Sequence, residues 1–193
     1  MTRSLYLASS SKYRRELLTR LQINFRCESP QIDESPESGE TPLDTCKRLA
    51  REKAMAVAAE HPSAIVIGSD QVADVDGAAI SKPGTHDRAR AQLRSMSGKT
   101  IVFHTAVCVY CLETSKTVEF TVPTSVEFRD LNSAEIERYL IAEEPYDCAG
   151  SAKSEGLGIS LLKRIESSDP TALIGLPLIE VANALRQFEL TLP

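Results

Sequence analysis

Short apolar runs and stretches with helical periodicity alternate along this chain of 193 residues. The first apolar run, Leu5–Ala8, stops in three serines, and leucines at helical spacing follow it. A second run, Ala64–Gly68, is continuously apolar, as expected of a buried strand. This alternation predicts an α/β fold, with an elongated mixed sheet and helices flanking it.

Capping and turn residues suggest where the other elements begin and end. Thr41 and Thr85 are N-cap candidates, and Asn132 with Glu135 has the pattern of a capping box. The sequence predicts helices over about residues 11–21, 41–60, 85–96 and 132–143, and a last helix opened by Pro177. It predicts strands over 5–8, 24–28, 64–68, 78–81, 100–112, 117–129 and 159–165, with an exposed loop over 29–40. The two long strands are expected to pair as an antiparallel ribbon, and residues 1–193 are expected to form one domain.

Composition narrows the class of protein. The chain is 42% apolar and 25% charged, which is typical of a globular protein, and its formal net charge of −5 argues against a general nucleic-acid binder. No stretch approaches the roughly 18 apolar residues of a membrane span, and no signal peptide is recognised. With five cysteines and no export signal, we expect a cytoplasmic protein with reduced thiols. The pair Cys108 and Cys111 should point to opposite faces of one strand, which favours a structural role for both.

The serine-rich turn after the first apolar run is a candidate anion site. A helix N-terminus presents free N–H groups and the positive end of the helix dipole. Lys12, Arg14 and Arg15 lie in the first turn, although cations there are unfavourable for the helix itself. A ligand with several negative charges would explain them. The alternative is a serine-capped helix with solvated basic residues, and this stretch alone does not decide between the two.

Lys53 falls on the apolar face of its predicted helix, near Leu49, Ala50 and Val57. A lysine pointing inward needs a partner or a pocket. The alternative is that its ammonium group snorkels to the surface.

The acidic residues suggest hard-metal chemistry. Asp33 and Glu34 lie in the predicted loop, and Asp70 is expected at the carboxyl end of a buried strand, where α/β proteins often place active-site groups. Oxygen ligands without a His or Cys cluster suit Mg²⁺ or Mn²⁺. His61, His86 and His104 lack metal-ligand spacing, and the chain has no nucleophile elbow or P-loop. The chemistry that remains is metal-assisted attack of water on a phosphate ester or anhydride, with a carboxylate accepting the proton.

A series of motifs across nearly the whole chain resembles the Maf-like nucleoside triphosphate pyrophosphatases, and most closely their subgroup acting on 7-methyl-GTP. The motifs are Leu7–Ser11 with Arg14, Asp33-Glu34, Arg51–Ala54, Gly68–Gln71, Ser81–Pro83, Asp147–Ser151 with Ser154–Gly156, and Gly175–Leu178. One tripeptide would be weak evidence, but seven motifs in order are specific.

The resemblance implies two lobes around a deep cleft and a divalent metal, Mg²⁺ or Mn²⁺. It implies cleavage between the α and β phosphates to give a nucleoside monophosphate and pyrophosphate. It also implies roles for individual residues. Asp70 is the catalytic base, Ser9, Arg14, Lys53 and Lys82 contact phosphates, Glu34 and Asp70 bind the metal, and Tyr13, Gln71 and Glu155 set the base preference.

Chemistry at the base agrees with this assignment. A carboxylate such as Glu155 can accept from both N–H donors on the guanine edge. Methylation at N7 makes the base cationic, which an aromatic face such as Tyr13 favours, although the subgroup usually has tryptophan at this position.

Two other functions remain open at this point: a nucleotide-binding regulator of cell division with little turnover, and the same chemistry on a pyrimidine triphosphate. The expected partner is a small nucleotide, with no nucleic-acid polymer and no membrane, and the protein could be a homodimer.

Overall fold

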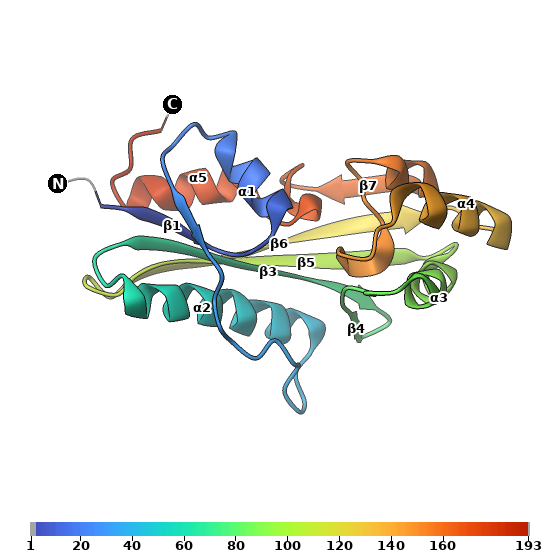
Figure 1. Ribbon diagram of the computed structural model, residues 1–193, viewed down its shortest axis with the longest axis horizontal. Coiled ribbons are helices and arrows are strands. Elements are labelled where there is room, and N and C mark those ends of the chain that lie inside the picture. The colour runs from blue at the N-terminus through green and yellow to red at the C-terminus, as the bar shows by residue number, and fades with distance from the viewer. Residues whose placement is uncertain (1–2, 193) are drawn as a thin grey trace.

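A long mixed sheet runs through the computed structural model, which describes residues 3–192 (Figure 1). In this part of the chain the strand order is β2-β1-β3-β5-β6-β7, and β4 pairs with β3 outside that order. The strands are β1 Leu5–Ala8, β2 Arg26–Glu28, β3 Ile65–Val75, β4 Ala78–Ile80, β5 Thr100–Cys111, β6 Lys116–Phe128 and β7 Leu162–Ser167. The helices are α1 Lys12–Thr19, α2 Pro42–Glu60, α3 His86–Met96, α4 Ser133–Glu143 and α5 Leu178–Gln187, with 3-10 turns η1 Ala149–Ser151, η2 Leu157–Leu161 and η3 Ala172–Ile174.

The sheet is parallel at one end of its strand order and antiparallel at the other. β1 pairs in parallel with both β2 and β3, whereas β3–β5, β5–β6 and β6–β7 are antiparallel. The predicted long ribbon is confirmed, because β5 and β6 pair from Thr100↔Glu127 to Cys111↔Lys116.

Helices divide the sheet into two lobes along its length (Figure 1). In one lobe α1 and α5 cover one face of the sheet around a core that includes Leu7, Leu17 and Val181, and α2 covers the opposite face. In the other lobe α3 and α4 pack around Leu93, Phe128 and the far ends of the long strands. The predicted mixed α/β fold is confirmed, and the long strands β3, β5 and β6 join the two lobes.

The predicted helix N-caps are confirmed. Thr41, Thr85 and Asn132 each accept a backbone hydrogen bond as N-caps, and Asn132 and Glu135 form the reciprocal capping box. α2 ends at Glu60 as expected.

Strand β3 corrects the prediction that a buried strand ends before Asp70. The strand continues to Val75, because β5 pairs with it from Val66 to Asp74. On its other edge, β3 pairs with β1 only as far as Gly68, and with β4 only from Ala73. Residues 69–72 therefore form an unpaired edge between β1 and β4. Asp70 lies at the carboxyl end of its neighbour β1 rather than at the end of its own strand.

Two other predicted strands had wrong bounds. The strand predicted over 159–165 is wrong at both ends, because residues up to Leu161 form a 3-10 turn and pairing with β6 runs from Leu162 to Ser167. The strand predicted over 24–28 is shorter, because β1 pairs only with Arg26–Glu28. The start of β7 is set by the end of its partner β6 at Phe128, and the length of β2 is set by the short strand β1.

The cysteines behave as structural residues in the described chain. All five are free thiols, and Cys108 is buried on the α2 side of β5. Cys111 lies within 3.6 Å of the Arg3 guanidinium. The structural interpretation of this pair is therefore supported. No helix within residues 3–192 has the length and apolar character needed to cross a membrane.

Candidate active site

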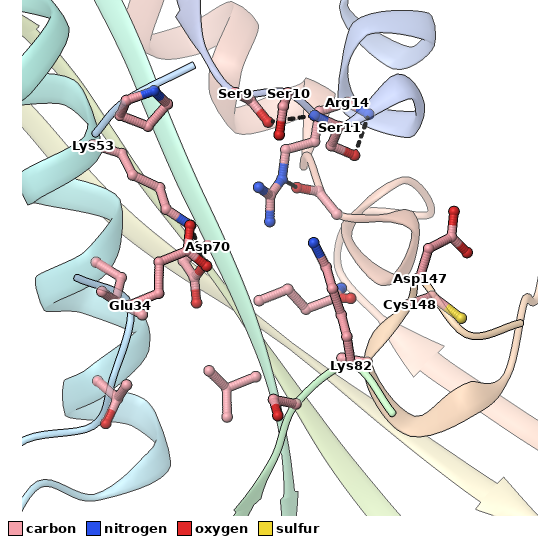
Figure 2. Close-up of a pocket in the computed structure, with 18 of the residues that line it drawn as sticks. Ser9, Ser10, Ser11, Arg14, Glu34, Lys53, Asp70, Lys82, Asp147 and Cys148 are labelled. Carbon is pink, nitrogen blue, oxygen red and sulfur yellow. Dashed lines mark hydrogen bonds and ion pairs between the residues drawn. The ribbon is translucent and has the colours of Figure 1, made fainter. Parts of the chain in front are cut away.

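A cavity of about 540 Å³ opens where the edge of β3 is unpaired (Figure 2). This volume is within the range of about 300–1,000 Å³ that is usual for ligand sites. The strands β3 and β4 line it, together with segments far apart in the chain: the β1–α1 turn, the 29–36 loop, α2, the link after β4, residues 147–149 and residues 174–175. Strand alternation matters here, because Asp70 points to the α2 face while Ser69 and Gln71 point to the opposite face.

The serine turn forms one wall of the cavity. The Ser9 hydroxyl is buried and accepts a hydrogen bond from the backbone N–H of Ser11 at 3.1 Å. The Ser11 hydroxyl is the N-cap of α1 and accepts from the Arg14 backbone N–H at 3.4 Å. The first turn of α1 contains no acidic residue, so the N-terminus keeps its positive character toward the cavity.

Arg14 extends into the cavity from α1 and is held by a backbone carbonyl. Its Nε donates to the Gly175 oxygen at 2.9 Å, and the Ser69 hydroxyl donates to the same oxygen at 3.1 Å. Gly175 has a φ of 121°, a left-handed value that other residues adopt only with strain. The guanidinium is therefore fixed in direction before any ligand arrives. Figure 2 shows the Lys82 ammonium reaching toward it from the opposite wall.

Lys53 is buried at the α2 wall and pairs with two acids. Its Nζ lies 2.7 Å from Asp70 Oδ1 and 2.9 Å from Glu34 Oε1, and its side chain is 5% exposed. Snorkelling to the surface is therefore wrong for this lysine. Burial alone would raise the pKa of Glu34, but hydrogen bonding to Lys53 and the charges of Lys53, Lys82 and Arg14 hold it below its usual value.

Gly68 makes this contact possible. A Cβ at this position would lie 2.2 Å from the Ala50 oxygen and 2.6 Å from the Ala54 nitrogen. Only glycine lets α2 approach β3 so closely, and the approach brings Lys53 within reach of Asp70.

The two carboxylates fit a hard divalent cation. Mg²⁺ commonly binds through one or two carboxylates together with waters and substrate phosphates. Asp70 and Glu34 share Lys53 as a partner and therefore lie close together. Within the part of the chain that the structure describes, no group of three His, Cys, Asp or Glu residues could hold a metal by itself. A cation at this position would thus depend on oxygens from a phosphate ligand.

The three residues expected to set base preference are placed differently from one another. Tyr13 lines the cavity, and its hydroxyl donates to the Asp147 carboxylate at 3.1 Å. Gln71 also lines the cavity, but its side-chain NH₂ donates to Thr105 Oγ1 and to the carbonyls of Ala172 and Leu173, which anchors η3 to β3. Glu155 is exposed and is not among the residues that line the cavity.

Asp147 and Cys148 line the cavity on the wall opposite Asp70, and neither had an assigned role in the prediction from sequence. Both belong to the predicted motif Asp147–Ser151. Burial, reinforced by the charge of Asp147, raises the pKa of Cys148 to about 12, so its thiol stays protonated and is not a nucleophile near neutral pH. The motif indicates that Asp147 and Cys148 lie near the site, but it does not indicate that their side chains line the cavity.

The histidines have structural partners, as expected. His61 stacks on Tyr6 with ring centroids 4.1 Å apart and contacts Glu28 at 2.7 Å. His86 bonds with Tyr146 and Glu137, both at 2.9 Å. None of the three histidines lines the cavity.

The site therefore combines a helix N-terminus, a fixed guanidinium and an exposed lysine with a buried carboxylate next to its lysine partner. The first set can bind several phosphate oxygens. The carboxylate can accept a proton from an attacking water. Among the cavity residues, no activated Ser or Cys competes with that water as the nucleophile.

Comparison with known proteins agrees with this chemistry. The family model described as "Maf-like protein" matches residues 4–188. Three similar proteins are named 7-methyl-GTP pyrophosphatase: one from Albidiferax ferrireducens, 56% identical over 95% of this chain and 92% of its own; one from Ralstonia nicotianae, 57% identical over 94% of both chains; and one from Bordetella pertussis, 55% identical over 96% of this chain and 92% of its own. Among solved structures, the Ham1 protein of Staphylococcus aureus is similar with a TM-score of 0.46 and 16% identity, covering 66% of this chain and 73% of that one.

Proposed function

This chain belongs to the Maf-like protein family, and on that premise we propose that it hydrolyses 7-methyl-GTP to 7-methyl-GMP and pyrophosphate. The observation that carries the proposal is the cavity at the unpaired edge of β3, where the N-terminus of α1, Arg14 and Lys82 face the buried Asp70 carboxylate. Relatives at 55–57% identity that carry the name 7-methyl-GTP pyrophosphatase support the choice of substrate.

The triphosphate would lie between the β1–α1 turn and Lys82. Ser9, Ser11 and the N-terminus of α1 offer donors to its oxygens, and Arg14 offers a planar pair of N–H groups. Arg14 is already held by Gly175, so little side-chain freedom is lost when phosphate binds. As pyrophosphate leaves, Arg14 and Lys82 stabilise the charge that develops on it.

Asp70 would act as the general base. It takes the proton of a water that attacks the α phosphorus, and the bond from that phosphorus to the bridging oxygen breaks. Lys53 holds Asp70 Oδ1 at 2.7 Å and so orients the carboxylate. Asp70 and Glu34 would also hold Mg²⁺ or Mn²⁺, which when bound neutralises phosphate charge and lowers the pKa of water.

We infer that the enzyme works in the cytoplasm, where nucleoside triphosphates are abundant and free thiols such as these are stable.

The test is product analysis with 7-methyl-GTP, GTP and UTP, each with Mg²⁺ and with Mn²⁺. We expect pyrophosphate and the monophosphate, with the highest kcat/KM for 7-methyl-GTP. Asp70→Asn should lower kcat by roughly 10²–10⁴-fold while circular dichroism stays unchanged, since a lost general base typically costs that much. Release of orthophosphate and a diphosphate would contradict cleavage between the α and β phosphates, and a variant keeping half the normal rate would remove Asp70 from the role of base.

The same panel separates the two alternatives. A regulator with little turnover would bind the nucleotides and release no pyrophosphate from any of them. An enzyme for pyrimidine nucleotides would prefer UTP.

A further inference from the structure

The segment between β7 and α5 carries the carbonyl that fixes Arg14. This segment contains the short 3-10 turn η3 and otherwise irregular backbone. Its Gly175 oxygen accepts from Arg14 Nε at 2.9 Å and from the Ser69 hydroxyl at 3.1 Å, and Figure 2 shows the guanidinium pointing into the cavity. Backbone outside helices and sheets is held in place by its other hydrogen bonds. The direction of the Arg14 guanidinium therefore depends on the contacts that fix this segment.

Asp169 is a buried carboxylate that fixes the segment from the side of α5. The residue is 1% exposed. Its Oδ1 accepts from the backbone N–H of Thr171 at 2.9 Å and from the Thr171 hydroxyl at 2.7 Å, and its Oδ2 accepts from the backbone N–H of Ile179 at 2.7 Å. Ile179 lies in the first turn of α5, and the N-cap of that helix, Pro177, makes no side-chain hydrogen bond. Asp169 thus caps α5 from outside the usual N-cap position, where the helix dipole favours a negative charge.

Thr171 extends this hold to the chain that follows Gly175. Its hydroxyl oxygen accepts from the backbone N–H of Leu178 at 2.8 Å and lies 2.8 Å from the Leu176 carbonyl oxygen. Leu176 is the next residue after Gly175. Asp169 and Thr171 together therefore set where the chain runs as it leaves Gly175.

The sheet holds the other side of the same segment. The Ala172 carbonyl accepts from the Thr105 hydroxyl at 2.9 Å, from the Gln71 side-chain NH₂ at 3.0 Å and from the Gly175 backbone N–H at 2.9 Å. Gly175 is thus fixed before it by the sheet and after it by the Asp169–Thr171 pair. Neither member of that pair lines the cavity, so any effect on a bound phosphate passes through the segment that they fix.

We propose that Asp169, together with Thr171, is a positioning residue for the phosphate-binding arginine, because it holds the Gly175 carbonyl where that oxygen directs the Arg14 guanidinium into the cavity. This inference rests on the proposed function, in which Arg14 binds phosphates. A carboxylate that only capped α5 would contribute to stability and leave the behaviour of Arg14 unchanged.

The direct test observes Arg14 in the free protein. An arginine Nε–H group gives its own NMR signal, and the signal missing from Arg14→Lys identifies this one. Thr171→Val keeps the side-chain shape and removes the hydroxyl, Thr171→Ser keeps the hydroxyl, and Asp169→Asn places an NH₂ group against a backbone donor. Exchange of the Arg14 Nε–H with water should be at least about ten-fold faster in Thr171→Val and Asp169→Asn, because its hydrogen bond opens more often. Thr171→Ser should restore the wild-type rate.

Two controls separate this effect from a general loss of stability. Ser168→Ala changes an exposed neighbour of Asp169, and Ile136→Val removes a buried methyl group from the core of the other lobe. Both should leave the Arg14 exchange rate unchanged, even where Ile136→Val lowers the melting temperature. An unchanged rate in Thr171→Val, or an equal increase in Ile136→Val, would overturn the proposal. If Asp169→Asn does not fold, Thr171→Val and Thr171→Ser carry the test.

The second test measures the consequence for the phosphates. Thr171→Val should lower kcat/KM for 7-methyl-GTP by about 10- to 100-fold, a loss typical of a misplaced binding group. The loss for GTP should be the same, because the two substrates share their phosphates. In an Arg14→Ala background, Thr171→Val should cause almost no further loss, since two residues that act through one contact do not act additively. Losses that add in the double variant would contradict a role through Arg14.

The two tests distinguish this inference from the proposed function. If no triphosphate releases pyrophosphate, the proposed reaction fails, while the exchange rate still decides whether Asp169 and Thr171 hold Arg14. If turnover is confirmed and the exchange rate is unchanged in Thr171→Val, only the positioning role fails.

Discussion

At the scale of single residues, Lys53 contributes both to the stability of the fold and to the position of the proposed catalytic carboxylate. Its ammonium group lies 2.7 Å from the buried Asp70 carboxylate and 2.9 Å from Glu34, whose side chain is 57% exposed. Removing one partner of a buried ion pair leaves the other charge uncompensated, which is costly. Lys53 therefore supports the fold and the active-site carboxylate together, and its position on an apolar helix face is explained without any ligand.

Lys53→Met should lower both the melting temperature and kcat. Methionine keeps the length of the side chain but leaves the buried Asp70 carboxylate without its partner, at a cost of about 3–5 kcal/mol in the free energy of unfolding. Urea unfolding and pyrophosphate release on the same preparations measure the two effects. Lys47→Met, an exposed change on the same helix, is the control. A higher melting temperature for Lys53→Met would show that the lysine is merely tolerated there.

At the scale of elements, close packing of α2 on β3 positions the catalytic carboxylate. The contact depends on Gly68, because the nearest atoms to a Cβ there are backbone atoms that cannot move aside.

Gly68→Ala should therefore destabilise the protein and impair turnover together. The added methyl group must push α2 from the sheet, and overpacking of this kind typically costs about 1–3 kcal/mol. Adding Ala54→Gly should not restore stability, since the closest contacts are to the Ala50 oxygen and the Ala54 nitrogen rather than to a side chain. Urea midpoints and kcat of the single and double variants give the answer, and full rescue by Ala54→Gly would show that the side-chain contact was the important one.

A second element-scale feature is the attachment of the 29–40 loop to α2. Arg48 donates to both oxygens of Glu40, at 2.6 and 2.9 Å, and also to the Ser35 carbonyl. These bonds position the loop that carries Glu34.

This attachment should weaken in acid. The hydrogen bond from Arg48 lowers the pKa of Glu40 from 4.5 to about 2. Because the pKa of Glu40 is lower in the folded protein than in the unfolded chain, the ionised carboxylate stabilises the fold. This contribution is complete above pH 4.5 and is lost as the pH falls toward 2. The difference in urea midpoint between wild type and Glu40→Gln should be constant from pH 7 to 5 and then shrink. A difference that grows as the pH falls would contradict this assignment.

At the scale of the whole molecule, the cavity lies between two lobes joined by shared strands. A ligand that contacts Arg14 and Lys82 binds the folded form only, so it should stabilise the molecule by mass action. The described residues include no group of three that could hold a structural metal.

A chelator should therefore abolish turnover without changing the melting temperature of the free protein. Nucleotide at about 100 times its dissociation constant should add roughly 2.7 kcal/mol to the free energy of unfolding. The Asp70→Asn variant is used for this measurement, because it should not hydrolyse the nucleotide. Scanning calorimetry with and without EDTA, and with 7-methyl-GTP, checks both statements. A large fall in melting temperature with EDTA alone would point to a structural metal instead.

The sequence by itself determined the local features of this protein. N-cap residues, proline positions and apolar periodicity were sufficient to predict α2, α3, α4 and the β5–β6 ribbon, because each depends on neighbours in the chain. Periodicity also identified Lys53 as facing inward. The motifs named the family and most cavity residues, including Asp70, Arg14 and Glu34.

Only the tertiary structure decided how these residues meet. The unpaired edge of β3 exists because β1 stops at Gly68 and β4 starts pairing at Ala73, and strand length depends on partners that local sequence does not reveal. The pairing of Lys53 with Asp70 and Glu34, and of Tyr13 with Asp147, joins segments separated by 17 to 134 positions. Glu155 and Asp147 are carboxylates of the same segment, and the fold alone placed one outside the cavity and the other on its wall, because the path of the chain after α4 sets which side chains face inward.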